Sequence, residues 1–124
     1  MKFDDKVPIY FQIKNYLYHQ IVTGILQPGE KMPSVRQLAI DVTANVNTVQ
    51  RALTEMLSEE IIVSQRGKGN FVTTDVDSIQ QLRNQLVEEQ LSLMYKELHA
   101  LNLTDEEILS EMKSYMESRD EAHE

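Results

Sequence analysis

Residues 28–72 read PGEKMPSVRQLAIDVTANVNTVQRALTEMLSEEIIVSQRGKGNFV, and this stretch decides the fold. Two segments with apolar residues at helical spacing meet at a connection of only a few residues. Two short runs rich in β-branched and aromatic residues follow, at residues 61–64 and 70–73. Between them lies QRGKG, whose two glycines supply the positive φ that a tight turn needs. We therefore expect two helices joined by a short turn, followed by a hairpin with a cationic tip.

The two helices have recognisable starts. Ser34 has Gln37 three residues on, which is capping-box spacing and predicts a helix over residues 34–42. Asn45 is the expected N-cap of the second helix, which we expect to end near Glu59. The faces that should be buried are Val35, Leu38, Ala39 and Val42 in the first helix and Val49, Ala52, Leu53, Met56 and Leu57 in the second.

Helices are also expected on both sides of this stretch. Upstream, Pro8 precedes apolar residues four apart, and Gly24 ends that helix; the residues are Ile9, Ile13, Leu17 and Ile21. Downstream, a long polar helix should begin near Asp77 or Ser78, and Thr104 with Glu107 forms a second capping box. The fold class is thus mainly α with a small β-hairpin, a winged helix-turn-helix followed by a two-helix segment.

Length and composition set limits on the whole chain. Its 124 residues suit one small domain with an appendage, and we expect the division at 1–75 and 76–124. The chain has no cysteine, and its three histidines (His19, His99 and His123) lack metal-ligand spacing, so we expect no metal site. No apolar run is long enough for a membrane span and the N-terminus lacks a signal-peptide core, which favours a cytoplasmic location.

The net charge of −8 is unevenly distributed. Residues 1–75 carry 8 basic and 8 acidic side chains, whereas residues 76–124 carry 4 basic and 12 acidic ones. DNA affinity depends on cations placed at phosphates rather than on total charge. The acidic tail therefore does not argue against nucleic-acid binding by the first part of the chain.

A winged helix-turn-helix places one helix in a DNA groove and its hairpin beside the backbone. The side chains offered on these elements are Asn, Thr, Gln, Arg and Lys, which suit base edges and phosphates. Asn47, Thr48 and Gln50 lie on the first turn and a half of the second helix, where base contacts are expected. The alternative for them is an ordinary polar surface.

Several motifs in order carry a resemblance to a known family. They are Pro8-Ile9-Tyr10-x-Gln12-Ile13, Gly24-x-Leu26-x-Pro28-Gly29, Pro33-Ser34-x-Arg36-x-Leu38-Ala39, Asn47-Thr48-Val49-x-Arg51-Ala52 and Gly67-x-Gly69-x-Phe71-Val72. Over about residues 7–73 the chain resembles the GntR family of bacterial transcriptional regulators. The short tail resembles the YtrA subfamily, in which it serves as a dimerisation module.

The resemblance implies DNA contacts by Arg36, by the start of the recognition helix and by the tip of the wing. With the residue types above, the candidate DNA-binding residues are Ser34, Arg36, Asn45, Asn47, Thr48, Gln50, Arg51, Arg66, Gly67, Lys68 and Gly69. Each has a simpler alternative. Arg36 is able to pair with Asp41 or Glu30 and Arg51 with Glu55, Asn45 is a cap in any case, and a charged hairpin tip also aids solubility.

Three positions depart from the family pattern. Val46 stands where relatives have proline or arginine, and Gln50 where some have arginine. Glu60 replaces a glycine, so a left-handed conformation there costs about 1 kcal/mol. These departures concern specificity and local strain rather than the fold.

The tail shows a narrow seam of apolar residues at spacings of three and four. Two helices alone bury too little to be stable, so we expect them to dock on a second copy; the alternative is packing within one chain. The candidate dimerisation residues are Leu82, Leu86, Val87, Leu91, Met94, Leu98, Leu101, Ile108, Met112 and Met116.

We therefore expect a sequence-specific DNA-binding regulator that binds an inverted repeat of double-stranded DNA as a homodimer. The family implies a repressor of a nearby operon, often one for an ABC transporter, with release by a small effector. The alternative is a winged-helix module that binds a protein. No nucleophile–base pair, phosphate loop or cofactor fingerprint is visible, so we expect neither an enzyme nor a cofactor.

Overall fold

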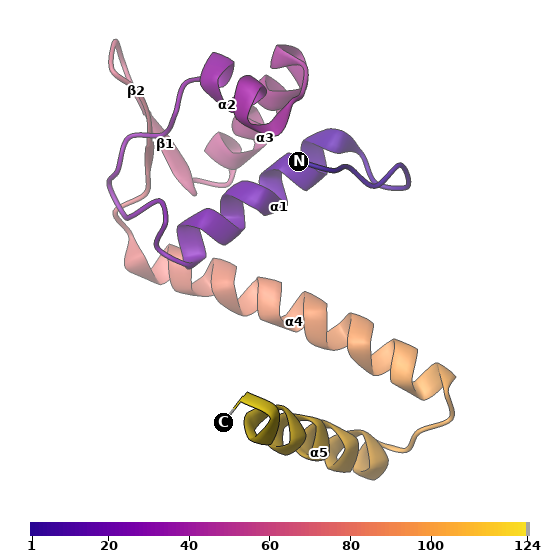
Figure 1. The fold of residues 1–124 in the computed structure, drawn as a ribbon. Helices are drawn as coiled ribbons and strands as arrows, with labels where there is room; N and C mark the ends of the chain where they lie inside the picture. Colours follow the sequence, from indigo (N-terminus) through magenta and orange to yellow (C-terminus); the bar gives the residue numbers. More distant parts are fainter. Residues whose placement is uncertain (124) are drawn as a thin grey trace. The chain divides into compact units, whose positions relative to one another are not determined.

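The computed structural model describes residues 1–123, with side chains up to Arg119. The elements are α1 (Ile9–Val22), α2 (Val35–Val42), α3 (Val46–Ser58), β1 (Ile62–Gln65), β2 (Gly69–Val72), α4 (Val76–Ala100) and α5 (Asp105–His123) (Figure 1). The expected fold class, mainly α with one antiparallel hairpin, is confirmed. The chain divides into two compact units, Met1–Arg83 and a second that begins at Asn84.

The first unit is built around α3, which lies against α1, α2 and β1 (Figure 1). Each of these elements contributes apolar side chains that are fully buried between them. Each such burial is worth roughly 1.5–3 kcal/mol, so this core supplies the main stabilisation of the unit. The largest of these side chains are Ile13, Leu17, Leu38, Val42, Val49, Leu53, Met56, Ile62 and Val72.

Each strand of the hairpin lies one residue nearer the tip than the sequence predicts, while the pairing of Ser64 with Asn70 is as expected. Gln65 pairs with Gly69 at the end of the ladder, and the Lys68 amide donates to the Gln65 carbonyl at 2.9 Å. The tip is therefore only residues 66–68. The free edge of β2 is also paired, because the Met32 amide donates to the Asn70 carbonyl at 2.8 Å. The segment before α2 thereby ties the wing to the helices.

Both expected helix caps in this unit are present. The Ser34 hydroxyl accepts the Gln37 amide at 3.1 Å, and Asn45 Oδ1 accepts the Asn47 amide at 2.7 Å. Only half of the capping box at Ser34 forms, because the Gln37 side chain donates to Asp41 at 2.8 Å instead of turning back.

α4 begins at Val76, slightly earlier than expected. The Asp75 carboxylate accepts from the backbone of Asp77 at 3.0 Å and from the Ser78 hydroxyl at 2.9 Å, so Asp75 caps the helix. The first turns of α4 belong to the first unit, since Leu82 is buried and the Arg83 guanidinium donates to the Val22 carbonyl. The contacts thus change character after Arg83, eight residues beyond the boundary at 75/76.

In the second unit, a turn at residues 101–104 reverses the chain between α4 and α5. The capping box is reciprocal: the Glu107 amide donates to the Thr104 hydroxyl at 3.2 Å, and the Thr104 amide donates to the Glu107 carboxylate at 3.1 Å. Asp105 Oδ1 also lies 2.8 Å from His99 Nε2 and accepts a hydrogen bond from the Tyr95 hydroxyl at 3.0 Å. Both hydrogen bonds lower the pKa of Asp105 below its usual value, and the one with His99 has the larger effect.

The end of α3 is strained at Glu60, as the sequence suggested. Glu60 has φ +62°, and the amides of Glu60 and Ile61 donate to the carbonyls of Leu57 and Met56. This is the Schellman arrangement, in which glycine is the preferred residue because it has no Cβ. A glutamate here holds an energetically unfavourable conformation so that the chain can turn into β1.

Replacing Glu60 by glycine should relieve this strain. We expect Glu60→Gly to raise the free energy of unfolding by about 0.5–1 kcal/mol, after allowance for the greater freedom of glycine in the unfolded chain. Urea denaturation at fixed protein concentration measures it. Glu60→Gln, which keeps the Cβ, should leave stability unchanged. Equal stabilisation by both variants would show that charge, not backbone strain, is the cause.

Candidate nucleic-acid interface

α3 has one buried and one exposed face. Val49, Ala52, Leu53 and Met56 are at most 1% exposed, whereas the side chains of the opposite face are solvent-accessible. That opposite face presents amides, a hydroxyl and a guanidinium at its N-terminal end; the residues are Asn47, Gln50, Arg51 and Thr54. A helix held in this way offers a row of hydrogen-bonding groups without moving its core side chains.

The first turn of α3 carries the candidate base-contacting residues. Asn47 and Gln50 are exposed and Thr48 is half-buried. The Gln50 amide donates to the Thr54 hydroxyl at 3.3 Å, a weak bond that leaves its carbonyl oxygen available. Asn45 is exposed but already acts as the N-cap, so the simpler role considered for it is present in the structure.

The wing presents its cations freely. Arg66, Gly67, Lys68 and Gly69 are all exposed, and neither cation has an ion pair among the described side chains. Gly67 adopts φ +76° with open space where a Cβ would lie, so the turn geometry alone explains this glycine. A tip with two free cations suits contact with phosphates.

α2 adds a third exposed group and a hollow. Arg36 is exposed and has no ion pair within the described part of the chain, so the pairing with Asp41 or Glu30 is not formed. Ser34, Lys68 and Gly69 line one hollow of about 340 Å³ between the start of α2 and the wing. Three of the candidate residues, one at the start of α2 and two in the wing, therefore line the same hollow.

A second hollow, of about 370 Å³, lies between the starts of α1 and α3. It is lined by Pro8, Ile9, Tyr10, Asn47, Thr48 and Arg51. Within this hollow, the Arg51 guanidinium lies 3.8 Å above the centre of the Tyr10 ring. Its Nε is also 3.8 Å from the Glu55 carboxylate, which is the i,i+4 pairing foreseen as the alternative.

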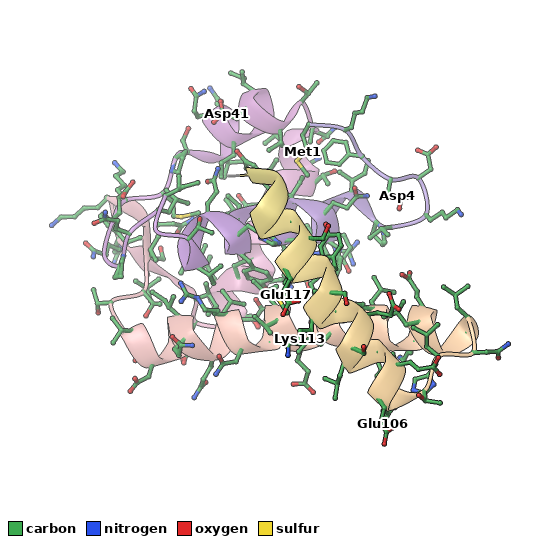
Figure 2. The ribbon with its side chains drawn as sticks, turned by 60° about the horizontal axis from the view of Figure 1, so that its bottom comes forward. Met1, Asp4, Asp41, Glu106, Lys113 and Glu117 are labelled. Atoms are coloured by element: carbon green, nitrogen blue, oxygen red, sulfur yellow. The ribbon has the colours of Figure 1, made fainter. Side chains whose placement is uncertain are left out.

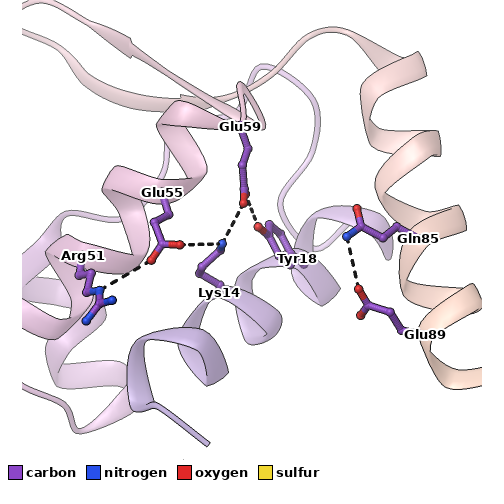
Figure 3. A network of polar contacts seen from close by, with 7 residues as sticks. All are labelled: Lys14, Tyr18, Arg51, Glu55, Glu59, Gln85 and Glu89. Carbon is purple, nitrogen blue, oxygen red and sulfur yellow. Dashed lines mark hydrogen bonds and ion pairs between the residues drawn. The ribbon is translucent and has the colours of Figure 1, made fainter. Parts of the chain in front are cut away.

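Arg51 belongs to a longer set of polar contacts between α1 and α3. Side chains spaced four apart face each other between the two helices: Tyr10, Lys14 and Tyr18 on α1, and Arg51 and Glu55 on α3 with Glu59 at its C-cap. Most of this set is drawn in Figure 3. We call these six residues the polar ladder.

Lys14 is the centre of the polar ladder. Its ammonium lies 2.8 Å from Glu59 and 3.4 Å from Glu55, and its side chain is 7% exposed (Figure 3). The Tyr18 hydroxyl donates to the same Glu59 carboxylate. Burial by itself lowers the pKa of Lys14, but the hydrogen bond with Glu59 and the proximity of Tyr18 outweigh it and raise that pKa. Lys14 is therefore a cation across the physiological pH range.

The sequence predicted no polar contacts for these side chains: Tyr10 appeared only in a family motif and Glu59 only as a helix end, and Lys14 and Tyr18 were not candidates. A clue was available: Lys14 and Tyr18 sit beside the apolar stripe of α1, where a lysine is unusual. What the sequence lacked was the crossing of α1 and α3, which decides that the two rows of side chains face each other.

The candidate dimerisation residues differ in exposure. Leu82 and Ile108 are 6% and 7% exposed, so both are buried within their own chain. Leu86, Met94, Leu98 and Met112 are half-buried. Four of the candidates remain half or more exposed: Val87, Leu91, Leu101 and Met116. Three further apolar side chains of the tail are equally exposed: Tyr115, which shares the face of Met116, and Leu93 and Leu109, which lie outside the predicted seam.

Other kinds of site find little support in the described residues. None of their helices is both long and apolar enough to cross a membrane. No group of three His, Cys, Asp or Glu side chains up to Arg119 is placed to hold a metal ion. The side chain of His123, one of the three histidines considered, lies outside the described ones.

The exposed face of α3, the short turn from α2 and the cationic wing together define a winged helix-turn-helix DNA-binding domain. Comparison with known proteins gives the family. Residues 9–72 match the model of the bacterial regulatory proteins of the gntR family, which is more than half of the chain. The chain belongs to the GntR family of transcriptional regulators.

Two relatives from Bacillus subtilis are similar over most of the chain. The uncharacterized HTH-type transcriptional regulator YhcF is 36% identical over 116 residues, 94% of this chain and 96% of YhcF. The HTH-type transcriptional repressor YtrA is 36% identical over 94 residues, 76% of this chain and 68% of YtrA. The resemblance to YtrA-type regulators is thereby confirmed.

Solved structures agree on the fold. A GntR family transcriptional regulator from Listeria monocytogenes superimposes with a TM-score of 0.84 at 38% identity, covering 90% of this chain and 98% of its own. The DNA-binding domain of AraR in complex with operator ORX1 matches with a TM-score of 0.52 at 27% identity, over 54% of this chain and 81% of its own.

Removing the buried cation of the polar ladder should weaken the fold. We expect Lys14→Met to lower the free energy of unfolding by about 1–2 kcal/mol, because Glu59 and Glu55 lose a charged partner but remain partly hydrated. Thermal or urea unfolding measures it. Lys113→Met on α5, where the lysine is exposed (Figure 2), should change stability by less than about 0.5 kcal/mol. Equal effects of the two variants would contradict a stabilising role for Lys14.

Proposed function

We propose that this protein is a homodimeric repressor that binds an inverted-repeat operator through α3 and the wing. The observation that carries the proposal is the exposed polar face at the start of α3 beside a wing with two unpaired cations. Two comparisons support it: YtrA is named a transcriptional repressor, and the AraR domain of similar fold is seen on an operator. As in the sequence-based division, residues 1–75 bind DNA and residues 76–124 join the protomers.

The binding residues divide by chemistry. Asn47 and Gln50 are suited to adenine, which accepts and donates to a side-chain amide in the major groove. Contacts with the DNA backbone fall to the hydroxyl, guanidinium and ammonium groups, to the Asn45 amide and to the backbone of the wing glycines. Those residues are Ser34, Arg36, Asn45, Thr48, Arg51, Arg66, Gly67, Lys68 and Gly69.

Dimerisation follows from the apolar side chains that the second unit leaves exposed. Leu91, Leu101, Leu109, Tyr115 and Met116 are each at least half exposed, and a second copy would cover them. A twofold dimer requires a twofold operator, with half-sites about one helical turn, ~34 Å, apart or further if the heads are spread. A small effector that alters the angle between the heads would release such a dimer from the promoter of a nearby operon, such as one for a transporter.

The wing and the reading helix should respond differently to substitution. Replacing Arg66 and Lys68 by alanine should weaken binding to specific and unrelated duplexes alike and reduce the slope of log K against log salt by up to about 0.9 per cation. Asn47→Ala and Gln50→Ala should instead cost about 1–3 kcal/mol at particular base pairs only. Fluorescence anisotropy over a salt series, with duplexes from the gene's own promoter region, separates these effects.

The salt dependence of DNA binding by the wild-type protein tests the proposal directly. Affinity should fall steeply with salt if phosphates are neutralised. A flat response would refute DNA binding and favour a winged-helix module that docks on a protein. If the wing and the reading-helix variants behave alike, the division of roles between them is wrong.

Charge placed on the exposed seam should separate the protomers. We expect Leu91→Glu combined with Met116→Glu to give a monomer in sedimentation velocity and to lower operator affinity, because the two heads are no longer linked. Ser92→Glu adds one acidic side chain at an exposed position of α4 outside the seam and should leave the dimer intact. Leu91→Glu alone, which adds the same single charge within the seam, should weaken the dimer. A wild-type protein that sediments as a monomer would contradict the proposed assembly.

A further inference from the structure

The polar ladder holds one exposed arginine of α3 in a fixed setting. Arg51 is exposed along 64% of its side chain, yet its guanidinium stacks on Tyr10 at 3.8 Å and its Nε faces Glu55 at 3.8 Å. A free arginine has many rotamers, and fixing one costs entropy when it binds. Here an aromatic ring and a carboxylate hold it before any ligand arrives.

The carboxylate is itself held in place. Glu55 also contacts the buried ammonium of Lys14, which is bound in turn to Glu59 and lies 5.7 Å from the centre of the Tyr18 ring. The position of Arg51 is therefore tied through Glu55 to the buried part of the α1–α3 interface (Figure 3). The alternating charges of Arg51, Glu55 and Lys14 leave the guanidinium as the outermost cation.

The stacked guanidinium opens onto the hollow it shares with Asn47 and Thr48. Asn47 belongs to the turn proposed to read bases, so the strand that passes this turn runs beside Arg51. A guanidinium carries five N–H donors in one plane, and stacking uses its face rather than its edge. Because the Arg51 side chain is 64% exposed, the donors that do not face Glu55 remain open to solvent and to a phosphate oxygen.

We propose that Tyr10 is a positioning residue that holds Arg51 for contact with a DNA phosphate. The inference rests on the proposed DNA-binding function and adds α1 to the parts that determine affinity. Tyr10 acts through the face of its ring, so the aromatic ring is required and the hydroxyl is not. The binding energy that Tyr10 contributes depends on the presence of Arg51.

A double-mutant cycle tests this coupling. The variants are Tyr10→Leu, Tyr10→Phe, Arg51→Met and the double variant Tyr10→Leu/Arg51→Met, with binding measured on an unrelated duplex and on the promoter region of the protein's own gene. We expect Arg51→Met to reduce the salt slope by about 0.9, the value for one phosphate contact. Tyr10→Leu should weaken binding about two- to fivefold, as expected for an exposed cation–π contact. In the Arg51→Met background the same change should have no effect.

Two controls separate positioning from damage to the fold. Tyr10→Phe keeps the ring and should restore wild-type affinity. Tyr16→Leu alters an exposed tyrosine of α1 outside the polar ladder and should leave affinity unchanged. Thermal unfolding of each variant shows whether α1 still packs on α3.

The outcomes distinguish the inference from the function on which it rests. If wild-type protein shows no salt-dependent binding, the proposed function fails. If the wild type binds but Tyr10→Leu and Arg51→Met are additive, only the positioning role is overturned. Equal losses from Tyr10→Phe and Tyr10→Leu would also overturn it, since the hydroxyl would then contact DNA directly.

Discussion

The burial of one face of α3 is the constraint on which the rest of the structure depends. Val49, Ala52, Leu53 and Met56 are excluded from water by α1, α2 and β1, and this fixes which side of the helix remains free. Because successive residues of a helix are separated by about 100°, burying these four leaves Asn47 and Gln50 outward. The surface proposed to read DNA is thus a consequence of the core.

Apolar packing fixes which face of α3 is buried, but it fixes the alignment of α3 along α1 less strictly. The polar ladder fixes this alignment, because Lys14 reaches both Glu55 and Glu59 only when its turn of α1 lies opposite the last turn of α3. Replacing a whole set of buried ionic groups with apolar residues often costs little stability, although removing one partner alone is destabilising. The polar ladder is therefore important chiefly because it specifies one arrangement of α1 and α3. A protein that reads DNA with the first turn of a helix depends on such alignment.

Much of this fold could be predicted from the chain. Helix starts at Ser34 and Asn45 and the glycine-rich hairpin are local features, and local features are readable in sequence. The polar ladder was not predicted, because it depends on how two distant helices cross. The tail shows the same limit: spacing indicates a seam, but only packing decides that Leu82 and Ile108 are buried within one chain while Leu91 is not.

The central claim is that two copies of α3 enter the major groove of one operator. Dimethyl sulfate footprinting of the region upstream of the protein's own gene tests it most directly, since the reagent reports guanine N7 in that groove. We expect two protected blocks related by twofold symmetry, about one helical turn or more apart. A fragment that is retarded by the protein but shows only a single asymmetric block of protected guanines would contradict a twofold arrangement of the two heads.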